Sequence, residues 1–311
     1  MTSPAFFDSR KSLKLFGLVD YFNFLKKLYN NDKLPKVLMF SGRKGSGKST
    51  LANHIIYYIF DNENYNLKTN ELNSNSKFHN QFKNNINTNI IYLSGSDFKN
   101  IKIEDIRNLK IKIFQTTISD KPRFIILDDV ELFNNNSLNA LLKIIEEPTK
   151  NNYFILINNK SKPMLETIKS RCLDIKIILN ESKRINIIES LVKNNNLNLY
   201  IDPNTSMLSP GNFVKFNYIF EENHISLEKD FLKNLKILLN LYKDDKKHIF
   251  IEMMQFLTDI YFNNLKNKKN FTSDKIIECK RFIFENINKF FLYNINQNAL
   301  LNTINNKIND E

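Results

Sequence analysis

An eight-residue loop near the N-terminus constrains this chain more than any other feature. Residues 42–49 read Gly-Arg-Lys-Gly-Ser-Gly-Lys-Ser and hold three of the six glycines in the chain. A short apolar run (37–40) precedes the loop, and a segment with helical spacing (49–60) follows it. Glycines let consecutive N–H groups turn inward around phosphate oxygens, and a helix that begins at the loop adds its positive end. The pattern therefore predicts a phosphate-binding strand–loop–helix unit.

The chemistry of such loops assigns roles to single residues. Lys48 is expected to reach the terminal phosphates, and the Ser49 hydroxyl to hold magnesium. Asp128 ends an apolar strand pattern, where a second magnesium-side carboxylate belongs, although acidic pairs at strand ends are also common turn formers. We expect ATP or ADP with Mg²⁺ as cofactors, with Ser49 and Asp128 on the metal. The full set of expected binding residues is Gly42, Gly45, Gly47, Lys48, Ser49, Thr50 and Asp128.

Strand and helix patterns alternate through the first part of the chain. The five strand patterns lie at 37–40, 90–93, 124–127, 153–157 and 174–178. Helical patterns lie between them and before them, the first at 13–29, which predicts a three-layer α/β domain with a mostly parallel sheet over 1–179. The Asn-rich segment 61–89 is expected to be a long loop with at most one poor helix. Only helical patterns follow, which predict a small lid (180–220) and an all-helical C-terminal domain (221–311).

Composition and charge exclude several classes of protein. The hydrophobic share of 42% and charged share of 25% are typical of a soluble globular chain, and no apolar run approaches the ~18 residues that a membrane span needs. Two cysteines exclude a disulfide framework and an all-cysteine zinc site, and they fit a reducing, cytoplasmic setting. The net charge of +12 favours a polyanionic partner such as nucleic acid, although 50 Asn residues also indicate an AT-biased coding sequence.

Two further motifs resemble those of the clamp-loader ATPases of the AAA+ class. Residues 139–148 read Asn-Ala-Leu-Leu-Lys-Ile-Ile-Glu-Glu-Pro, and Ser-Arg-Cys stands at 170–172. In the bacterial DNA polymerase III loader, the first motif follows the second acidic motif and the second follows the sensor strand. The resemblance implies an AAA+ P-loop domain, a lid, a C-terminal oligomerisation collar and a role in DNA replication. The implied partners are other loader subunits (gamma/tau and delta), the sliding clamp and primer-template DNA.

The resemblance also implies catalytic roles for Arg171, Asp129 and Asn159. Arg171 would leave its own subunit and stabilise transition-state charge on ATP held by the neighbour. The alternative is a surface arginine paired with a carboxylate. Only 7 of the 45 basic residues are arginine, so a retained arginine is expected to need its planar guanidinium. Asp129 would polarise the attacking water, although it is one methylene shorter than the usual Glu. Asn159 would orient water or phosphate, with Asn158 as the alternative.

Two kinds of clamp-loader subunit remain open. Hydrolysing motor subunits of the gamma/tau type carry a four-cysteine zinc module and an arginine sensor in the lid. Here 61–89 has no cysteine and 209–215 has no arginine, which resembles the delta-prime type, whereas the intact phosphate loop resembles the motor type. We expect no zinc, and an assembly subunit that donates Arg171. The alternatives are a gamma/tau-like ATP-hydrolysing motor and a standalone phosphate-loop ATPase with another DNA-related task.

Overall fold

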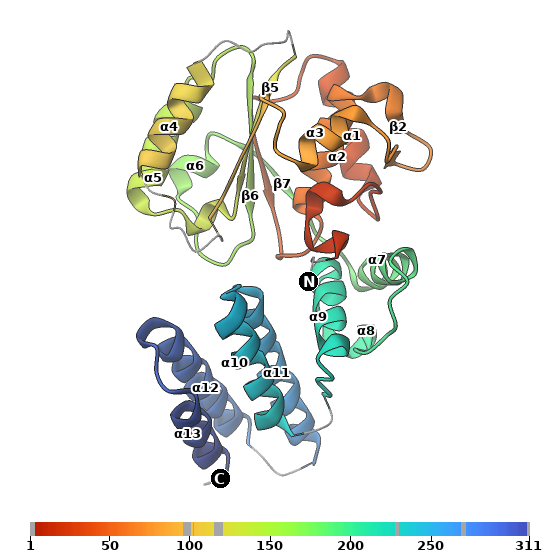
Figure 1. Cartoon of the computed structure of the whole chain (residues 1–311). Coiled ribbons are helices and arrows are strands. Elements are labelled where there is room, and N and C mark those ends of the chain that lie inside the picture. Colours follow the sequence, from red (N-terminus) through yellow and green to blue (C-terminus); the bar gives the residue numbers. More distant parts are fainter. Residues whose placement is uncertain are drawn as a thin grey trace. The chain divides into compact units, whose positions relative to one another are not determined.

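The computed structural model describes residues 4–95, 101, 103–114, 121–227, 230–268 and 272–309. The chain divides into two compact units (Figure 1). The first comprises Met1–Asn198 with Met207–Lys215, and the second comprises Leu199–Ser206 with Phe216–Glu311. Among the described residues, no helix is long and apolar enough to cross a lipid bilayer.

A five-stranded, fully parallel sheet forms the centre of the first unit, with the strand order β4-β5-β6-β1-β7. Its strands are β1 (Val37–Ser41), β4 (Ile90–Ser94), β5 (Arg123–Asp128), β6 (Asn152–Asn158) and β7 (Leu173–Lys176). Ser41 pairs with Asn158, and Ser94 pairs with Asp128. The register therefore brings the carboxyl ends of four strands to one edge, where the phosphate loop follows β1.

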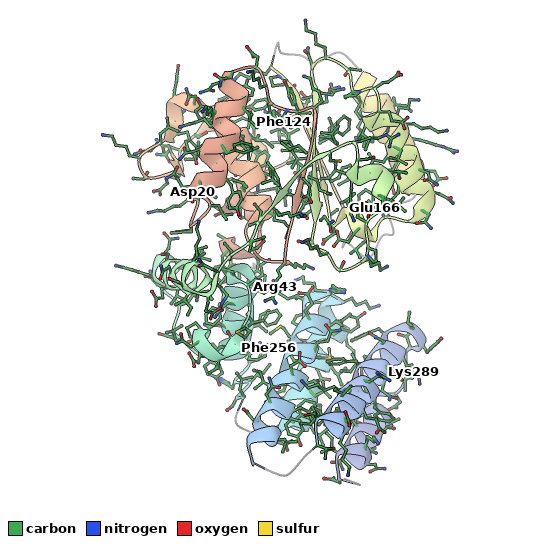
Figure 2. All side chains as sticks on the ribbon, turned by 180° about the vertical axis from the view of Figure 1, so that it is seen from behind. Asp20, Arg43, Phe124, Glu166, Phe256 and Lys289 are labelled. Carbon is green, nitrogen blue, oxygen red and sulfur yellow. The ribbon has the colours of Figure 1, made fainter. Side chains whose placement is uncertain are left out.

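Helices cover both faces of this sheet, as Figure 1 shows. One face carries α1 (Val19–Asn30), α2 (Lys48–Phe60) and α3 (Lys77–Lys83), and the other carries α4 (Ile103–Phe114), α5 (Asn135–Ile145) and α6 (Glu166–Lys169). Alternation along β1 feeds two cores, because Leu38 and Phe40 join the first and Val37 and Met39 the second. Phe124 is fully buried in the first core (Figure 2). The predicted three-layer fold is confirmed.

The N-terminal region and the segment 61–89 differ from the sequence-based expectation. The helix predicted over 13–29 begins only at Val19, because the backbone of Leu13 and Leu15 pairs with the chain around Leu72. This partner is a small hairpin of β2 (Tyr65–Asn66) and β3 (Glu71–Leu72), which lies before α3 inside 61–89. Two-residue strands are too short to show alternation in a sequence, so the hairpin could not be predicted.

Helices alone follow the sheet in the described part of the chain. They are α7 (Glu181–Asn194), α8 (Pro203–Ser206), α9 (Pro210–Glu222), α10 (Phe231–Asp245), α11 (Ile249–Lys268), α12 (Ser273–Tyr293) and α13 (Gln297–Asn309). Single 3₁₀ turns occur at Ala5–Phe7, Ser9–Lys11, Asn62–Asn64 and Val130–Leu132. Within the second unit, α10–α13 bury one apolar stripe each, such as Leu235 and Leu238 of α10. The division into a lid (180–220) and a collar (221–311) stays a prediction.

Candidate nucleotide-binding site and the exposed arginine

A cavity of about 610 Å³ opens at the loop between β1 and α2, inside the first unit. It brings together most of the residues that the sequence singled out. Those that line it are Gly45, Gly47, Lys48, Ser49, Thr50, Asp128, Asp129 and Asn159. Gly42 and Arg171 do not line it. Gly42 instead joins the loop to the sheet, because its N–H donates to the Asn158 carbonyl over 3.1 Å.

Two glycines give the loop its path. Gly45 (φ +78°) and Gly47 (φ +91°) lie in the left-handed region that side-chain-bearing residues rarely adopt. A Cβ on Gly45 would lie 2.4 Å from Ser209 Oγ, and one on Gly47 would lie 2.8 Å from a methyl group of Leu18. Gly47 also stands directly before α2, so the N–H groups of the helix's first turn face this end of the loop. The backbone therefore offers the donors that an anion needs.

Lys48 is a buried cation at the centre of the loop. Its side chain is 2% exposed, and Nζ donates to the carbonyls of Gly42 over 2.9 Å and Arg43 over 2.7 Å. Burial lowers the pKa of Lys48 to about 8, while the carboxylates of Asp128, Glu131 and Asp129 favour its charged form. Within the described residues, the hydrogen bonds of this buried ammonium go to neutral carbonyls, which suits it to an incoming anion.

Asp128 ends β5 beside the first turn of α2. Its Oδ2 accepts from Ser49 Oγ over 3.0 Å and from Tyr92 OH over 2.6 Å, and its Oδ1 accepts from the Asp129 N–H over 2.9 Å. The pKa of Asp128 is raised overall. Burial and the neighbouring Asp129 raise it, and they outweigh the hydrogen bonds from Tyr92 and Ser49, which lower it. Hydroxyl and carboxylate oxygens are ligands that Mg²⁺ prefers. Tyr92, on the neighbouring β4, was not expected from the sequence.

Asp129 and Asn159 meet across the ends of β5 and β6. Asn159 Nδ2 donates to Asp129 Oδ1 over 2.5 Å, and Asp129 has a left-handed backbone (φ 51°). Asn158 faces another partner, because its Oδ1 accepts from the Lys160 N–H. Glu131 fixes the residues that follow β6. Its buried Oε1 accepts from the Asn159 N–H over 3.1 Å and from Ser161 Oγ over 2.8 Å. Glu131 could not be predicted from a sequence pattern, because its partners come from a distant strand end.

The first residues of α9 and the turn before it brace the phosphate loop. Ser209 Oγ donates to the Lys44 carbonyl over 2.5 Å, and the Gly211 N–H donates to the Gly45 carbonyl over 2.8 Å. These bonds use carbonyls of the loop. Lys215, one turn further along α9, lines the same cavity, with Nζ 5.7 Å from the centre of the Phe7 ring. The turn is thus tied to the loop by a serine hydroxyl and a backbone N–H, and neither of these two contacts involves an arginine.

Arg171 lies between α6 and β7. Its side chain is 37% exposed, with one terminal nitrogen 2.8 Å from Glu146 Oε1 and the other donating to the Thr167 carbonyl over 2.8 Å. Glu166, which begins α6, is labelled in Figure 2 near this segment. The carboxylate partner that the sequence left open as an alternative is present. The guanidinium does not line the chain's own cavity and is in part accessible.

Across the described ranges, no group of three or more His, Cys, Asp or Glu side chains is arranged to hold a metal ion. In 61–89, His79 is buried on α3 and packs edge-on against Tyr57. The expected absence of zinc stays a prediction.

Comparison with known proteins identifies the family. A family model described as "DNA polymerase III, delta subunit" matches residues 19–180. The chain belongs to this family of DNA polymerase III clamp-loader subunits. A delta' subunit from Buchnera aphidicola subsp. Acyrthosiphon pisum is 27% identical over 94% of this chain and 88% of its own length. The delta' resemblance that the sequence indicated is therefore confirmed.

A gamma subunit and a solved structure are also similar to this chain. A DNA polymerase III gamma subunit from Buchnera aphidicola subsp. Schizaphis graminum is 29% identical over 51% of this chain, which spans only 44% of that subunit's length. The crystal structure of a gamma-subunit-related protein from Thermotoga maritima matches with a TM-score of 0.52 at 14% identity, over 90% of this chain and 96% of that one. This likeness confirms the predicted fold, an α/β domain followed by helices.

Proposed function

We propose that this chain is the delta'-type assembly subunit of a clamp loader, and that it donates Arg171 to the ATP site of a neighbouring subunit. One observation carries the proposal: Arg171 stands outside the chain's own cavity with its guanidinium in part exposed. An arginine supplied in trans must be accessible in the free subunit. It must also stand on a rigid element, and Arg171 follows directly on α6, whose Ile168 is fully buried.

We also propose that the chain's own cavity binds ATP or ADP with Mg²⁺. The residues fit the group, because Gly45 and Gly47 leave a cradle that a Cβ would obstruct, and Lys48 is a buried cation. Ser49 and Asp128 would hold the metal, which would neutralise phosphate charge when bound. In the delta' type, a nucleotide held here would stabilise the subunit.

A gamma/tau-like motor is the second candidate function. It is favoured by the fact that the phosphate loop, Asp128, Asp129 and Asn159 line a single cavity. Two features of the site disfavour it. The carboxylate of Asp129 is short, and Asn159 already donates to its Oδ1, so it is poorly placed to polarise a water. The segment 209–215, which contacts the phosphate loop, also has no arginine, whereas a motor subunit is expected to carry one there.

The proposed partners are those of the loader. They are gamma/tau and delta subunits, the sliding clamp and primer-template DNA, for which a net charge of +12 is favourable. We propose that residues 221–311 form the collar through which the subunits assemble, with 180–220 as the lid. The exposed apolar side chains of α12, Ile277, Leu292 and Tyr293, support this role.

The experiment that separates the two functions is ATP turnover with a defect in this chain's own site. Lys48→Ala should abolish nucleotide binding by the isolated chain, measured with a fluorescent nucleotide. In the reconstituted loader, an assembly subunit carrying Lys48→Ala leaves DNA-stimulated turnover nearly intact, whereas Arg171→Ala lowers it. A motor subunit would show the reverse order of effects, and its isolated wild-type chain would hydrolyse ATP.

A further inference from the structure

The arginine proposed to act in trans is held by two anchors from different elements. Glu146, at the C-terminal end of α5, accepts from one terminal nitrogen over 2.8 Å. The Thr167 carbonyl, within α6, accepts from the other over 2.8 Å. Two anchors on two terminal nitrogens fix both the position and the plane of the guanidinium. Ser170 Oγ also accepts, more weakly, from the nitrogen that contacts Thr167, over 3.4 Å. Among these acceptors, Glu146 is the charged one, and a side-chain substitution removes it.

We propose that Glu146 is a positioning residue that holds Arg171 in the orientation in which it meets the neighbour's nucleotide. The inference rests on the proposed function, because it concerns the regulation of the same trans contact. In this role, Glu146 touches no reacting atom. It acts only through the guanidinium, whose donors not taken by Glu146, Thr167 and Ser170 remain for phosphate oxygens.

The elements behind the two anchors are rigid. The Glu146 N–H donates to the Leu142 carbonyl over 3.0 Å and so continues the helical hydrogen bonding of α5. Ile145, the preceding residue, is 2% exposed within the second core, and Ile168 of α6 is fully buried in it. Glu146 and Arg171 are therefore linked through packed side chains as well as through their ion pair. A free arginine samples many rotamers, so a fixed partner raises the fraction of time spent in one of them.

The next residue along the chain provides a matched control. Glu147 carries the same charge, is also exposed, and does not pair with Arg171. A loss of charge near Arg171 is therefore separable from a loss of the contact. An exposed ion pair of this kind shifts a conformational equilibrium by a factor of about 2 to 5, which sets the size of the effect.

The test uses reconstituted loader in which only the motor site facing this chain has an intact phosphate loop. We expect Glu146→Ala to lower the kcat for ATP about 2- to 5-fold with KM unchanged, because a trans arginine acts on the transition state. Glu146→Gln, whose amide oxygen still accepts, should keep part of the rate. Glu147→Ala should match wild type. The double variant Glu146→Ala/Arg171→Ala should equal Arg171→Ala alone.

Several outcomes would overturn the inference. Glu146→Ala could match Glu147→Ala, could raise the rate, or could add a further loss in the Arg171→Ala background. Each of these results leaves the proposed function standing as long as Arg171→Ala lowers turnover. If Arg171→Ala itself has no effect in a complex that assembles normally, the proposed function fails together with the inference.

Discussion

Replacing Lys48 with methionine should stabilise the nucleotide-free protein while abolishing its nucleotide binding. Lys48 is 2% exposed, and burial lowers its pKa from 10.5 to about 8. At pH 7 this shift corresponds to about 3 kcal/mol of destabilisation, since one pKa unit is about 1.36 kcal/mol. Methionine has similar length and no charge to desolvate. It also lacks the donors to the Gly42 and Arg43 carbonyls, a loss of about 0.5–1.5 kcal/mol each.

The expected net gain in the free energy of unfolding is about 0.5–2 kcal/mol at pH 7. In thermal unfolding this is a rise in Tm of roughly 1–8 °C for a unit of this size. Below pH 8, Lys48 is charged in both folded and unfolded protein, so the full cost of burying the charge is present. Between about pH 8 and 10.5 only the unfolded protein keeps the charge, so that cost declines. The gap between variant and wild type should therefore be wide at pH 7 and narrow at pH 9.5.

Nucleotide should reverse the order of stability. At 100 times its Kd, Mg-ATP adds about 2.7 kcal/mol to wild type and nothing to Lys48→Met. Lys33→Met, at an exposed lysine just before β1, is the control and should show neither effect. The reasoning is refuted if Lys48→Met lowers the nucleotide-free Tm at pH 7, or if its gap to wild type is the same at pH 7 and pH 9.5.

Three further predictions test the loop, the expected absence of zinc and the collar. Gly45→Ala should cost about 1–3 kcal/mol and weaken nucleotide binding, because φ is +78° and the new Cβ meets Ser209; unchanged binding would contradict this. Elemental analysis should find no stoichiometric zinc, and one tightly bound zinc per chain would show the prediction to be wrong. Deleting 221–311 should leave nucleotide binding intact but prevent incorporation into the loader, whereas retained assembly would argue against a collar there.

The sequence was most informative where function depends on one continuous segment. The phosphate loop, its flanking strand and helix, and Asp128 at the end of β5 all follow from local patterns, and the structure places them around one cavity. Parallel pairing was also predictable, because strands that alternate with helices leave few other arrangements. The choice between Asn158 and Asn159 needed the structure, since the two side chains of adjacent residues at a strand end face different partners.

Contacts between distant segments were beyond the sequence. Tyr92 reaches Asp128 only because β4 lies beside β5, and Glu131 reaches the Asn159 N–H only because β6 ends next to it. The late start of the helix predicted over 13–29 has the same origin. Leu15 is apolar and fits a helix locally, but its N–H donates to the Asn70 carbonyl, so tertiary pairing overrides the local preference.

The most direct test of the central claim is single-turnover ATP hydrolysis by a loader whose one intact motor site faces this chain. We expect the wild-type chain to accelerate hydrolysis at that site by about 10³–10⁵-fold over the same complex carrying Arg171→Ala. Arg171→Lys should recover little, since one ammonium does not copy the forked guanidinium. Both variants should enter the complex and bind nucleotide as wild type does. Equal hydrolysis rates with wild type and Arg171→Ala, in complexes of equal composition, would contradict the account.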